Sequence, residues 1–266
     1  SGRLVMRLGD KGMLYLELST KGPATDQHSK WAPILSNPAW RLCWALASMK
    51  DSGEKILIDG FYDDVREPDE KEIELLKQIP FDEGAHRNIF GVRSFLVSGE
   101  KYELIKRLLF SPTCNIAGFH SGYEGPGSKT VLPSKAVVKM DIRLVPDQKP
   151  AEILGLLRRH LDKSGFSDVE VKTLNQMEPA RSSTTSSLVE TVSKAALDVY
   201  GANPIVYPIT MGSGPIYTVI NTLRIPTVSV SGVNRADSNI HGPNENIRRD
   251  DFIQGIKLAA RIISIF

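Results

Sequence analysis

The sequence contains five histidines, which are its first candidates for chemistry because a neutral imidazole binds metals and moves protons near neutral pH. His241 lies in the polar stretch SNIHGPNENIRRDD, just before the last apolar segment. His28 lies in a second loop-like stretch, TDQHSKWAP. A catalytic zinc takes about three protein ligands, so one loop histidine cannot hold it. The residues alone leave both histidines open, as surface loop residues or as parts of a site.

Three other motifs fail the geometry that their chemistry requires. In GYEGPGSKT, Ser128 occupies the position where a phosphate-binding loop has lysine. In TMGSGP, Met211 occupies the first glycine position of a serine-hydrolase elbow. His160 and Asp162 have an H-x-D spacing but fall on an expected helix, where positions i and i+2 face different directions. We therefore expect neither a nucleotide loop nor a serine nucleophile, and we expect His160 on a solvated helix face.

Composition limits the partners. The formal net charge is +2 and 41% of the residues are hydrophobic, which favours a globular protein without a nucleic acid or an anionic membrane as partner. No apolar run reaches the length of about 18 residues that a membrane helix needs. Cys43 and Cys114 lack CxxC spacing, so we expect reduced, buried thiols and a cytoplasmic protein.

The elements that would position these residues fall into two blocks. Residues 12–178 predict strand, helix, strands, helix and strand: the residues 12–20 and 55–61 read as strands, and Asn37 and Pro38 open a helix. This order is typical of an α+β split βαβ sandwich with a helical insertion at 62–110. A break rich in serine and threonine follows, and residues 179–266 alternate helix and strand in an α/β manner.

Four motifs in a fixed order carry a resemblance to a known family. They are the stretch LGDKGMLYLELST with DQHS and NPAW, then SGYEGPGSKTVLPSKAVVKMDIRLVP, TMGSGPI, and NIHGPNENIRRDDFIQGIKLAARII. Together they resemble the co-catalytic di-zinc exopeptidases, which include the carnosine and cytosolic dipeptidases, aminoacylase, acetylornithine deacetylase and succinyl-diaminopimelate desuccinylase. SGYEGPGSKT and IRLVP favour the cytosolic dipeptidase branch.

The resemblance implies a fold class. It is an α+β, ferredoxin-like lid inserted in an α/β zinc-peptidase catalytic domain, of which only the C-terminal part would be present. Residues 1–11 would end the first part of that domain, and 12–178 would form the lid and dimerisation domain, with the helical insertion at 62–110. Residues 179–266 would be the C-terminal part of the catalytic domain.

The resemblance also implies roles for three residues that could do chemistry. His241 would be a ligand in a site that holds two zinc ions, because neutral imidazole binds Zn²⁺ well. His28 would reach into the partner protomer's site and stabilise the oxyanion, where charge appears in the transition state. Arg143 would bind the substrate's carboxylate through two parallel hydrogen bonds.

Three further residues would contact the substrate, a dipeptide or an N-acyl amino acid. Thr130 would do so from the partner side of a homodimer formed through the lid, where an edge strand and a helix would pair. Gly212 and Ser213 would contact the substrate's end.

The remaining catalytic groups of this family have no match in the sequence. It contains no adjacent Glu-Glu pair, and its only H-x-D is at 160–162. We therefore expect this chain to be a C-terminal segment of a zinc-dependent peptidase or amidohydrolase, inactive alone because it lacks the base that activates water. Two alternatives stay open: a non-catalytic dimerisation module, and a pseudoenzyme lacking the metal half.

Overall fold

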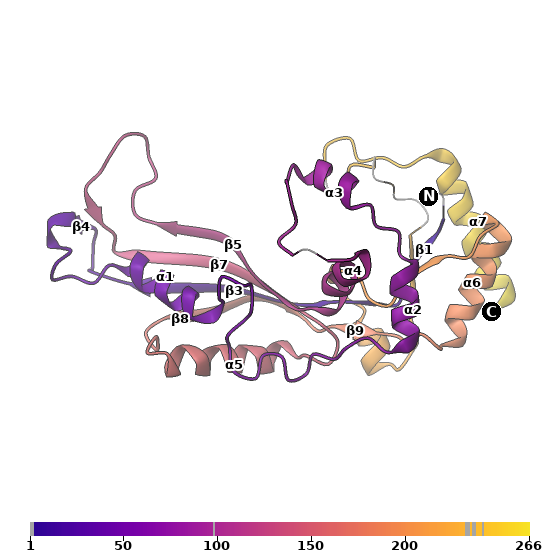
Figure 1. Ribbon diagram of the computed structural model, residues 1–266, viewed down its shortest axis with the longest axis horizontal. Coiled ribbons are helices and arrows are strands. Elements are labelled where there is room, and N and C mark those ends of the chain that lie inside the picture. Colours follow the sequence, from indigo (N-terminus) through magenta and orange to yellow (C-terminus); the bar gives the residue numbers. More distant parts are fainter. Residues whose placement is uncertain (1–2, 98, 232–234, 236–237, 241) are drawn as a thin grey trace. The chain divides into compact units, whose positions relative to one another are not determined.

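The structure is a computed structural model that describes residues 3–97, 99–231, 235, 238–240 and 242–266. The chain forms two compact units (Figure 1). Unit 1 consists of residues 1–11, 67–111 and 180–266, and unit 2 of residues 12–66 and 112–179. None of the helices in the described residues combines the length and the apolarity that a membrane span requires.

Unit 2 is built on a four-stranded antiparallel sheet. Its strand order is β5-β7-β3-β8, with β3 Gly12–Lys21, β5 Thr113–Ser121, β7 Lys135–Leu144 and β8 Glu170–Met177. Burial alternates along β3 and β7, because successive side chains point to opposite faces of a sheet. The buried face carries the leucines of β3 and the apolar side chains of β7, which form the core of the unit.

Two helices contribute to the same core. They are α1 Pro38–Met49 and α5 Pro150–Lys163. The start of α1 follows its sequence signal: the Asn37 side chain accepts a hydrogen bond from the amide of Ala39 at 2.9 Å, and Pro38 occupies the first helical turn. At one end of the sheet, β4 Gln27–His28 pairs with β6 Val131–Leu132, and the 3-10 turn η1 Ser29–Trp31 follows β4.

Unit 1 forms its own small sheet. Strand β1 Val5–Arg7 pairs in parallel with β10 Ile205–Tyr207 and antiparallel with β11 Ser229–Ser231. A second ladder joins β2 Gly9–Asp10 to β9 Ala180–Arg181. The helices of this unit are α2 Glu70–Gln78, α3 Glu83–Phe90, α4 Lys101–Phe110, α6 Ser187–Tyr200 and α7 Arg249–Ile265, with the π-helical turn η2 Thr218–Thr222.

The core of unit 1 joins its first and last segments. Leu4, Met6 and Leu8 are fully buried against apolar residues of α6, and Leu4 also shares a cluster with Leu258 of α7. The amphipathic helices α6 and α7 therefore cover a sheet that the N-terminal segment completes.

Residues 67–111 belong to unit 1, whereas we expected them inside a block running from 12 to 178. Two buried polar contacts explain this placement. The Arg181 guanidinium pairs with the Glu72 carboxylate, which is 1% exposed. The Lys11 ammonium, in a residue that is 2% exposed, donates to the carbonyls of Leu108 at 2.9 Å and Ser111 at 2.6 Å, at the end of α4.

The strand expected at 55–61 is wrong. Ile56 makes only an isolated bridge with Lys50, and turns follow it. Ile58 and Phe61 are nevertheless buried in the core of unit 2. The buried amide of Gln148 donates to the Phe61 carbonyl at 2.8 Å, so a side chain takes the place of a neighbouring strand.

Candidate functional site

The structure brings His28 and Thr130 together at the β4–β6 end of unit 2. His28 pairs with Val131 in the ladder, and the amide of Ser29 donates to the Thr130 carbonyl at 3.1 Å. Nε2 of His28 then lies 3.4 Å from Oγ1 of Thr130. Both side chains are exposed, so a further group has access to them.

The backbone of η1 sets the tautomer of His28. The amide of Lys30 donates to Nδ1 of His28 at 3.1 Å, so Nδ1 must be the unprotonated nitrogen. The proton of the neutral ring is therefore on Nε2, which acts as a donor. A donor at Nε2 is what stabilisation of a developing oxyanion requires.

Asp26 fixes the loop that leads into β4. Its carboxylate accepts hydrogen bonds from the amide and the hydroxyl of Ser134, at 2.8 and 2.9 Å. The hydrogen bond from the Ser134 amide is the main cause that lowers the pKa of Asp26, so this tether is present at neutral pH.

Arg143 lies toward the opposite end of the sheet. It sits on β7 opposite Met13 of β3 and Thr113 of β5. Its neighbours Ile142 and Leu144 are buried in the core, so Arg143 is directed to the other face of the sheet. It lies eight positions along β7 from Lys135, roughly 26 Å at about 3.3 Å per residue. The β4–β6 ladder lies at the far end of the sheet, beyond Lys135 (Figure 1). Within one chain, Arg143 and the His28–Thr130 pair therefore cannot touch the same dipeptide.

Gly212 and Ser213 belong to unit 1, in a loop that runs beside β2. The amide of Lys11 donates to the Gly212 carbonyl at 2.9 Å, and the amide of Thr210 donates to the Gly9 carbonyl at 2.9 Å. Gly212 is exposed and Ser213 is half-buried. Neither Asp10 nor Thr210 appeared among the sequence candidates, although Thr210 Oγ1 donates to Asp10 Oδ1 at 3.0 Å. These two residues are 200 positions apart, and no local pattern signals their contact.

His241 lies outside the described residues, so its expected role as a ligand stays a prediction. Around it, the buried residue Ser238 accepts from the amide of Asn246 at 3.0 Å, and the amide of Gly242 donates to the Asn239 carbonyl at 2.8 Å. Among the residues that the structure describes, no group of three or more histidine, cysteine, aspartate or glutamate side chains could hold a metal ion. The described donor set therefore does not fit the two-zinc site that the resemblance implies.

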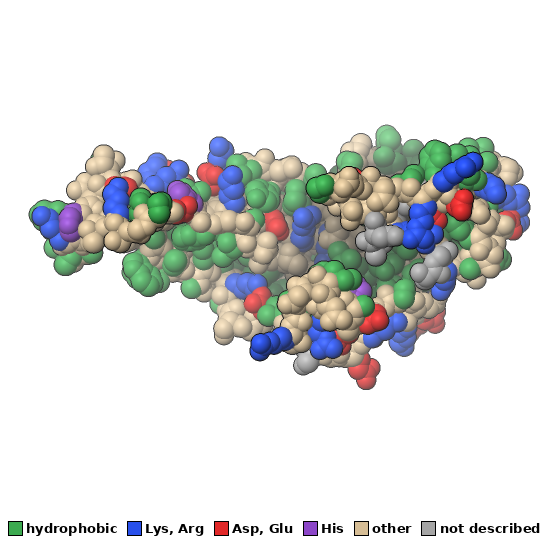
Figure 2. Space-filling model, turned by 90° about the horizontal axis from the view of Figure 1, so that it is seen from above, with side chains coloured by type: hydrophobic (Ala, Val, Ile, Leu, Met, Phe, Trp, Pro, Cys, Tyr) green, Lys and Arg blue, Asp and Glu red, His purple; other side chains and the backbone are tan. Residues whose placement is uncertain are grey.

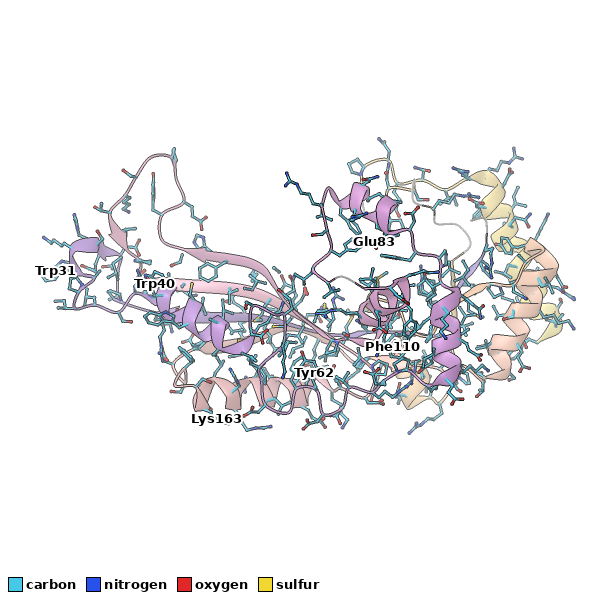
Figure 3. All side chains as sticks on the ribbon, in the orientation of Figure 1. Trp31, Trp40, Tyr62, Glu83, Phe110 and Lys163 are labelled. Carbon is cyan, nitrogen blue, oxygen red and sulfur yellow. The ribbon has the colours of Figure 1, made fainter. Side chains whose placement is uncertain are left out.

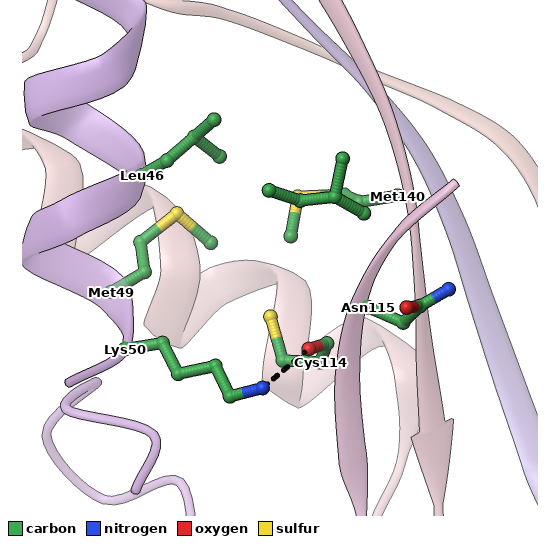
Figure 4. A pocket seen from close by; sticks show the side chains of 7 residues that line it. Leu46, Met49, Lys50, Cys114, Asn115 and Met140 are labelled. Carbon is green, nitrogen blue, oxygen red and sulfur yellow. Dashed lines mark hydrogen bonds between the residues drawn. The ribbon is translucent and has the colours of Figure 1, made fainter. Parts of the chain in front are cut away.

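A hollow in unit 2 is a different feature. It has a volume of about 200 Å³, opens beside β5, and is lined by Leu46, Met49, Lys50, Cys114, Asn115, Ile116 and Met140 (Figure 4). Lys50 Nζ lies 3.4 Å from the Cys114 carbonyl oxygen. Burial raises the pKa of the Cys114 thiol to about 11, so this thiol stays protonated and unreactive. None of the candidate site residues lines this hollow. Of the two cysteines that we expected to be buried, Cys114 is buried and Cys43 is exposed.

Comparison with known proteins decides the family. The family described as Peptidase family M20/M25/M40 matches residues 21–265. The chain belongs to this peptidase family. The match supports the resemblance found in the sequence motifs.

Individual relatives of the M20 family show how far the similarity extends. The chain is 30% identical to the mouse Beta-Ala-His dipeptidase over 259 residues, 95% of this chain and 52% of the mouse protein. A crystal structure of an M20 family metallo-carboxypeptidase from Sulfolobus solfataricus matches with a TM-score of 0.94 and 39% identity, over 99% of this chain and 60% of that one. The structure of the dipeptidase Dug1p from Saccharomyces cerevisiae matches with a TM-score of 0.84 and 27% identity. This match covers 99% of this chain and 56% of the Dug1p chain. The chain thus spans about half the length of the curated relatives that it matches.

The match corrects the expected fold class. We expected a lid domain with only a remnant of the catalytic domain, but the family match runs through both units, from residue 21 to residue 265. An α/β peptidase-family fold therefore extends over the chain. The physical reason is in unit 1, where β1 pairs with β10 and β11 and gives α6 and α7 a sheet to cover.

Proposed function

We propose that this M20 chain recognises dipeptides or N-acyl amino acids for a metal-dependent amide hydrolase. Arg143 binds the free carboxylate of the substrate. The neutral imidazole of His28 donates from Nε2 to the oxygen that becomes negative, and Thr130 lies beside it. Support comes from the M20 relatives, whose names describe dipeptidases and a metallo-carboxypeptidase.

The observation that carries this proposal is that Arg143 and the His28–Thr130 pair lie at opposite ends of the sheet, with most of the length of β7 between them. A dipeptide is much shorter than the roughly 26 Å that eight strand residues span. One chain therefore contributes Arg143 to one site and its His28–Thr130 pair to another. A homodimer satisfies this condition, because each protomer then supplies His28 and Thr130 to its partner's Arg143.

Unit 2 offers a surface for such a dimer. Strand β5 is an edge of the sheet, and its side chains Ile116 and Phe119 are 51% and 42% exposed. On α1, Trp40 and Trp44 are 61% and 55% exposed and stack on each other, with ring centroids 6.0 Å apart. Trp40 is labelled on this helix in Figure 3. Figure 2 shows hydrophobic side chains reaching the surface between charged ones. An edge strand and an exposed aromatic helix face are both suited to pairing with a second copy.

The proposal assigns the metal chemistry to residues outside the described set. A metal ion in such enzymes lowers the pKa of bound water and polarises the scissile carbonyl. The described residues contain no group of three or more histidine, cysteine, aspartate or glutamate side chains that could hold such an ion. The sequence also has no adjacent Glu-Glu pair that could supply the general base, and on that ground we propose that the 266-residue chain by itself binds substrate without hydrolysing it.

Size-exclusion chromatography with light scattering tests the assembly. We expect a mass near twice the 29.4 kDa of one chain. Trp44→Ser should shift the protein toward the monomer, whereas a matched change on the exposed face of α5, Arg158→Ser, should not. A wild-type monomer at tens of micromolar would contradict the contribution of His28 in trans.

A further inference from the structure

The loop of residues 210–214, with the sequence TMGSG, is anchored to β2 at two backbone positions. The amide of Thr210 donates to Gly9 and the amide of Lys11 donates to Gly212, both at 2.9 Å. Between these two bonds lies Asp10. Successive side chains of an extended segment point in opposite directions, so Asp10 and Lys11 diverge. Lys11 reaches the end of α4, and Asp10 reaches the loop.

The Asp10 carboxylate spans the loop from its first residue to its last. Oγ1 of Thr210 lies 3.0 Å from Asp10 Oδ1 and 3.0 Å from the Gly212 carbonyl oxygen, so its one proton can be donated to either acceptor. A side chain at position 214 would meet Asp10 Oδ2 and lie 3.2 Å from Asp10 Cγ. The carboxylate therefore fills the space where the Cβ of any other residue at position 214 would be, which is a physical reason for glycine there.

We propose that Asp10 and Thr210 are positioning residues that hold the loop in the shape that presents Gly212 and Ser213 to the substrate. The inference rests on the proposed function, which places these two residues against the substrate. A loop with two glycines in five residues loses much conformational freedom when it is ordered, so a tether is needed to keep it in one shape. The backbone bonds hold residues 210 and 212, and the carboxylate lies close against the backbone of residue 214.

Two substitutions at position 210 separate this role from simple packing. Thr210→Val keeps the shape of the side chain and removes the hydroxyl, whereas Thr210→Ser keeps the hydroxyl. Asp10→Ala removes the carboxylate, and Glu190→Gln on the exposed side of α6 is the matched control in the same unit. Thr210→Val keeps the inference testable if Asp10→Ala fails to fold.

The experiment measures two quantities on the full chain by NMR. The first is hydrogen exchange of the Lys11 amide, which reports on the bond to Gly212, with the Ile205 amide, bonded to Leu4, as reference. The second is the affinity for β-Ala-His, followed through the Ser213 amide. We expect Thr210→Val and Asp10→Ala to speed Lys11 exchange at least tenfold and to weaken dipeptide binding at least fivefold. Thr210→Ser and Glu190→Gln should stay within twofold of wild type, and Ile205 exchange should not change.

The possible results separate the two hypotheses. Unchanged exchange and unchanged affinity in both Thr210→Val and Asp10→Ala would overturn the inference. Faster exchange with unchanged affinity, in a chain whose binding is lost in Arg143→Ala, would overturn the positioning role and leave the proposed function standing. If the wild-type chain binds no dipeptide, the proposed function fails, and the Lys11 exchange rates alone decide whether Asp10 and Thr210 hold the loop.

Discussion

Nε2 of His28 lies 3.4 Å from Oγ1 of Thr130, although 102 positions separate the two residues. The short β4–β6 ladder makes this contact, and the Lys30 amide orients the ring from its other nitrogen. The pair thus presents a donor and a hydroxyl at the end of the sheet that is far from Arg143.

The tautomer of His28 can be observed directly. Because Nδ1 accepts from the Lys30 amide, we expect the neutral ring to carry its proton on Nε2. Two-bond ¹⁵N–¹H correlation spectra at pH 8 should show this form. Lys30→Pro, which removes the donating amide, should mix the two tautomers, while Lys30→Ala should not. A dominant Nδ1–H form in wild type would contradict the assigned role.

Arg143 should decide whether the chain binds substrates with a free carboxylate. A hydrogen bond to a charged group contributes about 1.5–3 kcal/mol, so Arg143→Ala should weaken β-Ala-His binding by a factor on the order of 10 to 100. Isothermal titration measures this loss. Arg159→Ala on the exposed surface of α5 is the matched control. If the C-terminal amide of the dipeptide binds as well as the free acid, Arg143 does not recognise the carboxylate.

The pair of Glu72 and Arg181 should stabilise unit 1 through its buried charge. Glu72→Gln keeps the capping box with Asp69 and removes only the charge. Breaking a buried ion pair costs about 3 kcal/mol at the lower end of its range. Urea unfolding should therefore show a clear loss for Glu72→Gln. Glu83→Gln, whose pair with Arg87 is about half exposed, should cost less than about 1 kcal/mol. Equal losses in the two variants would argue against a special contribution of the buried pair.

Cys114 should make stability fall in alkaline solution. Its thiol keeps its proton up to a pKa of about 11 in the folded protein, against an ordinary value of 9.0. Between these values the folded state binds more protons than the unfolded state, so the free energy of unfolding falls as pH rises. The contribution between pH 9 and 10 is about 1 kcal/mol. It should appear as the difference between wild type and Cys114→Ala in urea unfolding at the two pH values.

Labelling gives an independent check on Cys114. Iodoacetamide at pH 8 should modify the exposed Cys43 and leave Cys114 intact until the chain unfolds. Rapid labelling of Cys114 in the folded protein would contradict the raised pKa.

Local signals in the sequence predicted several elements well. Asn37 and Pro38 mark the start of α1. The alternating pattern of residues 12–20 corresponds to β3. Each of these signals acts within a few residues, so the sequence carries it directly.

Contacts between distant residues were beyond the reach of local patterns. The apolar residues of 55–61 are buried, but burial alone does not require a strand. The Gln148 side chain donates a hydrogen bond to the Phe61 carbonyl, which a neighbouring strand would otherwise have done. The membership of 67–111 in unit 1 depends on Glu72 meeting Arg181, 109 positions away. The resemblance of the motifs pointed to His28 and Thr130 as site residues, and the structure brings these two together. It did not select Asp10, which meets Thr210 only after folding.

Hydrolysis of β-Ala-His and Cys-Gly by the purified chain with added Zn²⁺ tests the central claim most directly. The measurement is the release of free amino acid over time, beside a titration that shows whether the same chain binds the dipeptide. We predict binding that depends on Arg143 and no release above the protein-free control. Metal-dependent release that a chelator abolishes would contradict the proposal that the chain recognises its substrate without hydrolysing it.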